Sequence, residues 1–313
     1  MVRIGIDLGG TNIAAGVVTD EGKLLYKIET PTFAERPWQP VVEDMIALSK
    51  RALTEAGCTV DDLRSIGVGV PGTAINGVVV FCTNLGWHDV PLERAFRAAI
   101  DRPLYIDNDA NVAGLAEAVS GVSAGVPNSV FLTLGTGLGG GVIINKKIYT
   151  GSHGVGGELG HLTFIAGGEM CTCGKRGCLE RYASATGMTR LASEVIRTHP
   201  YSGLAQAANN DPANLTGKLI VDQAKAGDLA AMMVFDQYVH YLAQGINTII
   251  SFIDPDMVVL GGGVSRAGAF LLDAVRLALP SYIFFKTLPH ASIELAVLGN
   301  DAGIIGAAML GAE

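Results

Sequence analysis

Two stretches of the chain, residues 2–26 and 130–151, repeat one pattern of apolar and polar positions. In each, an apolar run leads through a turn rich in glycine and threonine into a second apolar run, and a polar turn then precedes a third apolar stretch. Apolar runs separated by such turns predict β-strands joined as hairpins. The duplicated pattern therefore predicts two related domains that face each other.

Helical and strand patterns alternate along the rest of the chain. Apolar residues recur at helical spacing over 43–57, where Gly57 fits a helix C-cap. The small residues of a helix expected at 110–121 suit close packing on a neighbour. Strands alternating with helices predict an α/β fold, and the repeat places a domain boundary near residue 119. Further strands are expected at 66–72, 104–109 and the start of 256–268, and further helices at 92–100, most of 182–250 and 299–311.

Composition narrows the class of protein. The 313 residues are 49% hydrophobic and 17% charged, which predicts a globular chain with a large core and more than one domain. The net charge of −8 argues against nucleic acid as a partner, because binding a phosphate backbone needs a basic surface. We find no signal-peptide pattern and no apolar run long enough to cross a membrane. We expect a cytoplasmic protein whose five cysteines stay reduced.

The two glycine-rich turns are Gly9-Gly10-Thr11, which Asp7 precedes, and Gly135-Thr136-Gly137. Glycine lets the backbone approach a ligand closely, and successive N–H groups in such a turn form a nest that binds anions. A tight turn without a ligand is the alternative. Two matched turns in matched domains favour a phosphate site.

Two G-x-G-x-x-G matches, which start at Gly67 and Gly135, do not indicate a dinucleotide fold. That fingerprint needs a helix to begin inside the motif, so that its N-terminus meets the pyrophosphate. Here the strand-like runs V-V-V-F and V-I-I-N follow, and the P-loop motif is missing from the sequence. A nicotinamide-dependent enzyme stays as an alternative that hydride transfer would support.

Asp107, Asn108 and Asp109 follow a predicted strand and precede a predicted helix. Ligand sites of open α/β sheets gather at the carboxyl ends of strands. Either aspartate could simply cap the helix. It could instead act as a general base, because an ionised carboxylate can orient a hydroxyl and accept its proton late in phosphoryl transfer.

Three of the cysteines, Cys171, Cys173 and Cys178, lie in the run C-T-C-G-K-R-G-C. In a reducing compartment this spacing predicts a metal site before a disulfide, and three thiolates with one imidazole form a closed, structural zinc site. His161 is the nearest upstream histidine, and His153 is the second choice. Unligated cysteines and a redox pair are the alternatives. The fold could also bring close His88, His199, His240 or His290.

Two glutamates, Glu158 and Glu180, flank the cysteine run. Exposed glutamates are usually solvated surface. Together with Asn108 and Asp109 they could instead form a ring of hydrogen-bond acceptors, which suits a polyhydroxylated neutral ligand such as a sugar.

Four motifs, D-L-G-G-T-N, N-D-A-N, G-E-L-G-H and C-T-C-G-K-R-G-C-L-E, occur in this order. They resemble the ROK family of bacterial sugar kinases and repressors over essentially the whole chain, and the cysteine motif after G-E-x-G-H is highly specific. The family belongs to the actin-like/hexokinase-like ATPase superfamily. The resemblance therefore implies two ribonuclease-H-like α/β domains with a nucleotide cleft between them. It implies a small domain of residues 1–118 plus about 300–313, and a large domain of 119–299 that carries the zinc loop.

The resemblance also implies a role for each motif residue. Asp109 would be the catalytic base acting on the 6-hydroxyl of a sugar, and the other hydroxyls would be held by Asn84, Asn108, Glu158, His161 and Glu180. The phosphates of ATP would meet Asp7, Gly9, Gly10, Thr11 and Asn12, with Asp7 near Mg²⁺, and also Gly135, Thr136 and Gly137. The adenosine would meet Gly261, Gly262 and Gly263. Structural Zn²⁺ would be held by His161, Cys171, Cys173 and Cys178.

The expected function is ATP-dependent phosphorylation of the 6-hydroxyl of a hexose, with glucose as the expected substrate. The runs C-L-E-R-Y-A-S-A-T-G and N-L-G-W resemble the glucokinase branch most, whereas kinases for allose, mannose, fructose and N-acetylmannosamine share nearly all the motifs. A sugar-binding regulator is a further alternative, although the DNA-binding domain of ROK repressors would have no room ahead of Asp7. The expected partners are a hexose and ATP, with no nucleic acid and no membrane, in a homo-oligomer (a dimer or tetramer).

Overall fold

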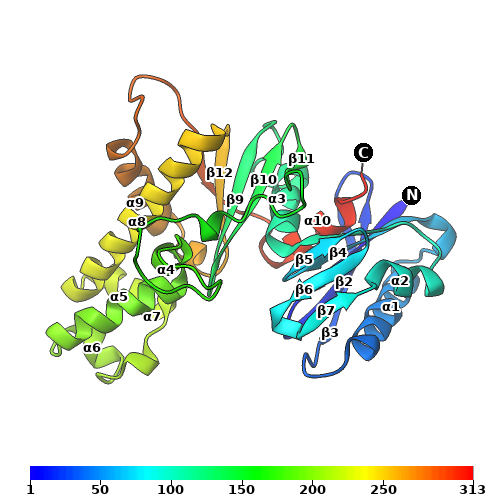
Figure 1. The fold of residues 1–313 in the computed structure, drawn as a ribbon, viewed down its shortest axis with the longest axis horizontal. Coiled ribbons are helices and arrows are strands. Elements are labelled where there is room, and N and C mark those ends of the chain that lie inside the picture. Colours follow the sequence, from blue (N-terminus) through cyan, green and yellow to red (C-terminus); the bar gives the residue numbers. More distant parts are fainter. Residues whose placement is uncertain (313) are drawn as a thin grey trace. The chain divides into compact units, whose positions relative to one another are not determined.

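The computed structural model describes residues 1–312, and within them the strands form three sheets (Figure 1). The first sheet has the order β3-β2-β1-β4-β8, the second β11-β10-β9-β12-β13, and the third β5-β6-β7. The strands are β1 (Val2–Leu8), β2 (Asn12–Thr19), β3 (Leu24–Pro31), β4 (Leu63–Val70), β5 (Thr73–Ile75), β6 (Val78–Cys82), β7 (Trp87–Val90), β8 (Leu104–Asn108), β9 (Ser129–Leu134), β10 (Leu138–Ile144), β11 (Lys147–Ile148), β12 (Met257–Gly261) and β13 (Ser292–Leu295).

Helices connect and cover these strands. The α-helices are α1 (Trp38–Glu55), α2 (Leu92–Ala99), α3 (Asp109–Ser120), α4 (Glu180–Ala183), α5 (Ala185–Thr198), α6 (Gly203–Ala207), α7 (Gly217–Lys225), α8 (Leu229–Ile253), α9 (Ala269–Ala278) and α10 (Ala302–Met309). The 3₁₀ helices are η1 (Val60–Asp62), η2 (Thr83–Leu85), η3 (Leu159–His161), η4 (Pro212–Asn214), η5 (Val264–Ala267), η6 (Leu279–Ser281) and η7 (Gly299–Asp301). Within residues 1–312, none of the helices is both long and apolar enough to cross a membrane.

The chain divides into two compact units. Unit 1 comprises residues 1–129, 141–157 and 297–313, and unit 2 comprises residues 130–140 and 158–296. The predicted boundary near residue 119 differs from this division, because the turn after α3 and the β11 region pack on α3 itself. The domain bounds implied by the resemblance stay a prediction.

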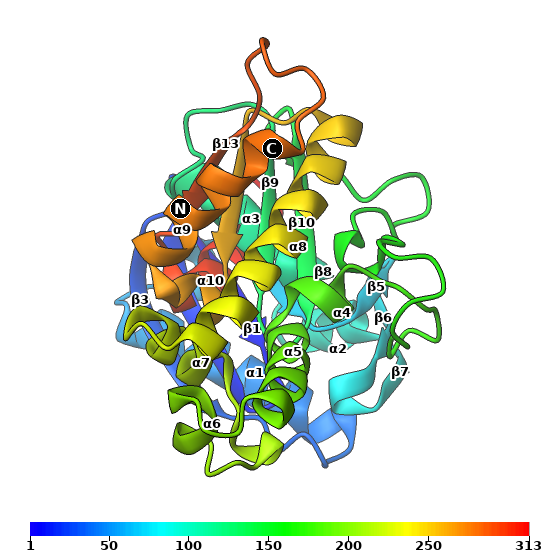
Figure 2. The ribbon, with the colours of Figure 1, turned by 90° about the vertical axis from the view of Figure 1, so that its left-hand side faces the viewer.

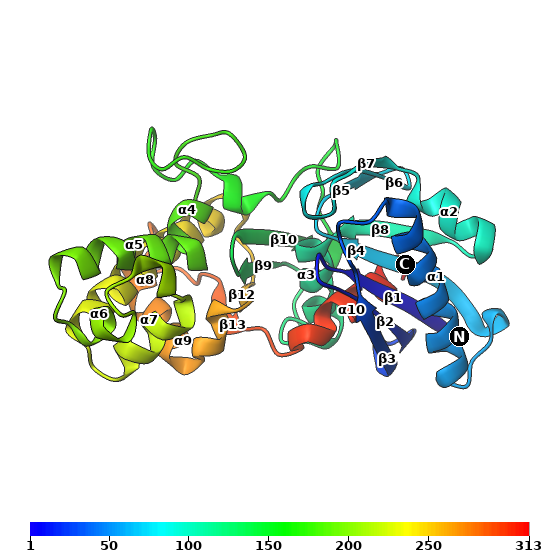
Figure 3. The ribbon, with the colours of Figure 1, turned by 90° about the horizontal axis from the view of Figure 1, so that it is seen from below.

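Unit 1 is organised around the first sheet, whose two faces are covered by different helices. Successive residues of a strand point to opposite faces. Ile4 and Ile6 of β1 belong to a core that includes Met45 of α1, whereas Gly5 between them meets the backbone of α10. A Cβ at Gly5 would lie 1.8 Å from the carbonyl oxygen of Ile304, so only glycine allows α10 this close. Figure 3 shows α1 and α10 on the two sides of this sheet.

Helix α3 packs against α10, as its small residues predicted. Gly306 of α10 lies so close to α3 that a Cβ there would be 1.8 Å from the carbonyl oxygen of Val112. Leu115 and Ala118 of α3 share a small core with Ile304 of α10. The N-terminus of α3 is thereby fixed at the edge of the sheet where β8 ends.

Unit 2 is mainly helical. Helix α8 packs against α4, α5, α7 and α9, and Figure 2 shows it beside α5 and α7. Tyr238 of α8 is fully buried and donates a hydrogen bond of 3.1 Å to the carbonyl oxygen of Ala183, which joins α8 to α4. The predicted helical region is thereby confirmed.

Most predicted elements are found where the pattern indicated. The duplicated pattern is confirmed, because β1-β2-β3 and β9-β10-β11 are consecutive strands that neighbour each other in their sheets. Gly57 has φ +71° directly after the C-cap of α1. The helix expected over 299–311 begins instead as η7, and α10 is the shorter segment 302–309.

Candidate active site

Unit 1 brings its predicted site residues to one edge of the first sheet. Strands β1, β4 and β8 run parallel, so their carboxyl ends meet at the same edge. Ligands of open α/β sheets bind at such edges. The Gly9-Gly10-Thr11 turn follows β1 directly, and Asp109 follows β8.

The first glycine turn is held by Thr32, which the sequence did not single out. The N–H of Gly9 donates to the carbonyl oxygen of Asn12 at 2.9 Å and closes the hairpin. The fully buried Thr32 donates its hydroxyl to the carbonyl oxygen of Gly9 at 2.7 Å, and its N–H donates to that of Thr11 at 2.8 Å. The turn is thus fastened through its carbonyl groups.

Asn108, rather than an aspartate, is the N-cap of α3. Its Oδ1 accepts from the N–H of Ala110 at 2.9 Å, and its Nδ2 donates to the carbonyl oxygen of Gly72 at 3.3 Å. Asp109 is the first residue of the helix, with an exposed side chain whose Oδ1 lies 2.8 Å from the same Ala110 nitrogen. A helix N-terminus stabilises a carboxylate, and the side chain of Asp109 is open to solvent.

Asn84 belongs to the same edge. It lies in η2 directly after Cys82, and a Cβ built on Gly10 would be 3.8 Å from the Cβ of Asn84. Burial raises the pKa of Cys82, and the negative charge of Asp109 raises it further. Unit 1 therefore brings the first glycine turn, Asn84 and Asp109 to the same sheet edge.

Two further carboxylates lie below this edge. Burial raises the pKa of Asp7 on β1, although the charge of Lys27 lowers it in part. Burial also raises the pKa of Asp107, whose Oδ1 accepts from the N–H of Asn108 at 2.7 Å and from Nδ2 of Asn111 at 2.8 Å. Asp107 thus supports the start of α3, whereas a cation near Asp7 would favour its ionised form.

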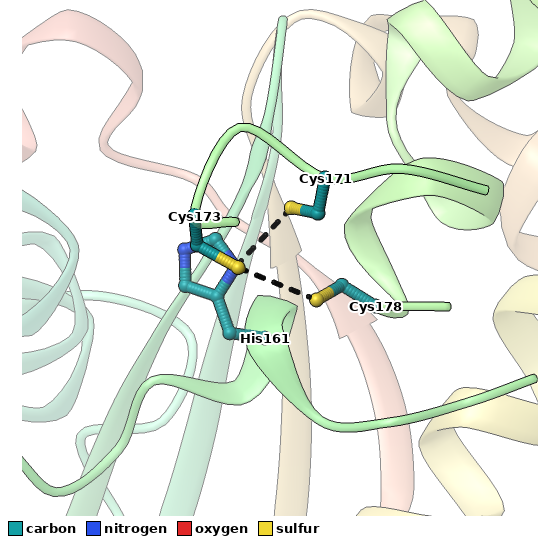
Figure 4. Close-up of side chains that lie close together, drawn as sticks. All are labelled: His161, Cys171, Cys173 and Cys178. Carbon is teal, nitrogen blue, oxygen red and sulfur yellow. Dashed lines mark hydrogen bonds between the residues drawn. The ribbon is translucent and has the colours of Figure 1, made fainter. Parts of the chain in front are cut away.

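In unit 2 the four predicted metal ligands converge (Figure 4). One ligand atom each from His161, Cys171, Cys173 and Cys178 lies within 4.8 Å of the others. Nδ1 of His161 is 3.7 Å from Sγ of Cys171, and Sγ of Cys173 is 3.6 Å from Sγ of Cys178. The second-choice histidine, His153, is outside this cluster, and all five cysteines are free.

The thiols of this cluster differ in environment. Burial raises the pKa of Cys178 to about 12. A hydrogen bond from the backbone of Lys175 lowers the pKa of the exposed Cys173. A cation among the ligand atoms would favour the thiolate form of all three cysteines.

Glu180 joins the cysteine loop to the second glycine turn. Its Oε1 lies 3.6 Å from Sγ of Cys171, and its Oε2 accepts from the N–H of Leu138 at 3.0 Å. A Cβ on Gly137 would be 2.3 Å from Oε2, so the turn and the carboxylate are in close contact. The side chain of Glu158, at the start of η3, is exposed.

The other face of the second turn borders a cavity of about 460 Å³ in unit 2. Pockets of this size bind small molecules. Gly135, Thr136 and Gly263 line it, whereas Gly261 packs on Phe131. Gly262 packs on the backbone of Leu134. The sequence did not indicate the charged lining residues, because they lie on α7 and η5 without any recognisable motif: Lys218, Asp222, Lys225 and Arg266.

Comparisons with known proteins agree with this geometry. The ROK family model matches residues 3–313. The chain belongs to the ROK family. The "Glucokinase" of Halalkalibacterium halodurans is 37% identical over 310 residues, which are 98% of this chain and 94% of that protein.

Two solved ROK structures resemble this ROK protein over nearly their whole length. A ROK glucokinase from Streptomyces griseus, in complex with glucose and AMPPNP, is 33% identical with a TM-score of 0.82, covering 99% of both chains. The ROK hexokinase from Thermus thermophilus is 35% identical with a TM-score of 0.84, covering 99% of this chain and 97% of that chain. The predicted α/β, actin/hexokinase-like fold is thereby confirmed.

Proposed function

We propose that this protein transfers the γ-phosphoryl group of ATP to the 6-hydroxyl of glucose. The observation that carries the proposal is an exposed aspartate at a helix N-terminus, on the same sheet edge as a glycine turn, in a chain 37% identical to a glucokinase over nearly all of its length. The resemblance of the motifs to the glucokinase branch supports the same substrate.

Asp109 is the proposed catalytic base. As the 6-hydroxyl oxygen forms its bond to γ-phosphorus, the bond from phosphorus to the ADP oxygen breaks, and the hydroxyl proton passes to Asp109. Because the transition state is loose, this carboxylate mainly orients the hydroxyl and accepts the proton late. The remaining sugar hydroxyls are assigned to Asn84, Asn108, Glu158, His161 and Glu180.

The nucleotide is assigned to the two glycine turns and to the cavity of unit 2. The turns supply backbone N–H donors for phosphate oxygens: Gly9, Gly10, Thr11 and Asn12 in the first, and Gly135, Thr136 and Gly137 in the second. The cavity beside Gly263 has the volume for an adenosine. Lys218 in its lining pairs with Asp222, and Lys225 and Arg266 add positive charge that suits an anionic ligand. Gly261 and Gly262 precede Gly263 and pack on Phe131 and on the backbone of Leu134, respectively.

Asp7 is the proposed carboxylate near Mg²⁺. Magnesium in phosphoryl-transfer sites is held by one or two carboxylates together with substrate phosphates, and a desolvated carboxylate next to a phosphate turn fits this role. When bound, the ion neutralises charge on the transferring phosphates.

We expect Gly303→Ala to lower activity through Asp7. The added Cβ would lie 2.4 Å from Oδ2 of Asp7, so the carboxylate must move. A displacement of about 1 Å at a reacting centre lowers the catalytic rate by about 10²-fold. Helix stability should not be the cause, because alanine is favoured over glycine inside a helix by about 1 kcal/mol. Titration of the rate with Mg²⁺ checks the result. Gly125→Ala is the control, because its Cβ meets nothing within 4 Å; equal rates for both variants would contradict the role.

Structural zinc is the proposed occupant of the cysteine cluster. Three thiols and an imidazole match a standard closed zinc set. With Nδ1 of His161 directed to the cluster, its other ring nitrogen is available to a sugar hydroxyl. The metal would perform no chemistry; it would stiffen the loop that carries His161 and Glu180.

A hexose panel tests the substrate. ADP release in a coupled assay should give the highest kcat/KM for glucose, and glucose-6-phosphate dehydrogenase should accept the product. Faster turnover of allose, mannose, fructose or N-acetylmannosamine would move the assignment to that sugar. ATP-independent sugar binding without ADP release would instead support a regulator. Size measurement in solution tests the expected homo-oligomer.

A further inference from the structure

Glu117, in the last turn of α3, is a fully buried acid. Its Oε1 accepts from the N–H groups of Val297 and Leu298, both at 2.9 Å, and its Oε2 accepts from the N–H of Val122 at 2.9 Å. Three backbone N–H groups thus donate to this carboxylate.

Burying an acidic side chain in a protein core is unfavourable to the free energy of folding. A buried charge is tolerated only when hydrogen bonds satisfy it, and an apolar side chain of similar volume often serves stability as well or better. A negative charge near a helix C-terminus is also unfavourable to the helix dipole. An acid at this position is explained by its three hydrogen bonds, which connect separate segments of the chain as an apolar side chain could not.

The three donors belong to two of the segments through which the chain passes between unit 1 and unit 2. Val122 lies between α3 and β9, and the first segment of unit 1 ends at residue 129. Val297 is the residue at which the chain re-enters unit 1. Leu298 follows it and leads through η7 into α10.

These two connections adjoin helices α3 and α10. Helix α3 carries the proposed base, and α10 contacts the proposed magnesium carboxylate. Asp109 is the first residue of α3, eight residues before Glu117 on the same helix. Asp7 contacts α10 at Gly303, five residues after Leu298. The side chain of Glu117 thereby connects the C-terminal end of α3 by hydrogen bonds to the segment that leads into α10.

We propose that Glu117 is a positioning residue that fixes these two chain connections to α3 and so keeps Asp109 and Asp7 in place for the reaction. This inference rests on the proposed kinase activity for its rate effect, but not for its structural part. It adds to the site a residue that touches neither the sugar nor the nucleotide.

Glu117→Gln tests the inference with a nearly isosteric side chain. An amide has one acceptor oxygen and one donor nitrogen, so in either orientation at least one of the three N–H groups loses its acceptor. We expect faster hydrogen exchange at residues 122, 297 and 298, and a kcat lowered about 10-fold or more, since misplacement by about 1 Å costs up to about 10²-fold. The KM for glucose should change less. Glu117→Asp, which keeps the carboxylate, should recover part of kcat.

Met45→Ala is the matched control, because Met45 is fully buried in the α1 core of unit 1 and touches neither connection. Both variants are compared at the same interval below their melting temperatures. An unchanged kcat in Glu117→Gln, or an equal loss of kcat in Met45→Ala, would overturn the positioning role. If the native protein releases no ADP with any sugar, the proposed function fails, and unchanged exchange at residues 122, 297 and 298 would still overturn the inference by itself.

Discussion

Replacing Asp109 by Asn is expected to lower kcat by about 10²- to 10⁴-fold, the usual contribution of a general base. The amide keeps the size of the side chain, and its oxygen can still accept from the N–H of Ala110. The N-cap of α3 is Asn108, so the helix keeps its cap. Glucose binding, measured by calorimetry, should stay close to normal while ADP release almost stops.

Asp211→Asn is the control for this change. Asp211 is exposed and caps η4, where its Oδ1 accepts from the N–H of Ala213 at 2.9 Å, so the same chemical substitution is made at a comparable helix start. It should leave the rate unchanged. Near-normal turnover of the Asp109 variant would remove Asp109 as the base and would count strongly against the kinase assignment.

Replacing Cys173 by Ala is expected to remove bound zinc. Losing a residue that only supports a metal ligand lowers metal affinity by up to about 100-fold, so losing a ligand itself should lower it by more. Cys173 is exposed, so the substitution leaves little cavity and its effect reports on the metal. Without the ion, the loop that carries His161 and Glu180 loses its restraint. The KM for glucose should rise and the melting temperature should fall. Elemental analysis and sugar titration check both.

The control is Cys58→Ala, which changes a half-buried cysteine away from the cluster. It should keep its zinc and its KM. A chelator added to the native protein should reproduce the Cys173 phenotype. Full zinc occupancy in the Cys173 variant would exclude Cys173 from the ligand set.

Local patterns predicted most elements and several site residues. The glycine turns could be predicted to lie between consecutive strands, because apolar runs and turn residues act over only a few positions of the chain. The C-x-C-x4-C spacing placed three cysteines in one loop for the same reason. Proximity along the chain favoured His161 over His153, and η3 does bring the His161 ring to Cys171.

The sequence by itself determined the α/β fold, the duplicated hairpins, the three-cysteine loop and an acidic group at a strand end. These features are encoded within short windows, where periodicity and turn chemistry act directly. Only the tertiary structure decided that Asn108 caps α3, that Asn84 lies beside Gly10, and that Glu117 binds the N–H of Leu298. Such pairs are far apart in the chain, and packing of whole elements, rather than local preference, brings them together.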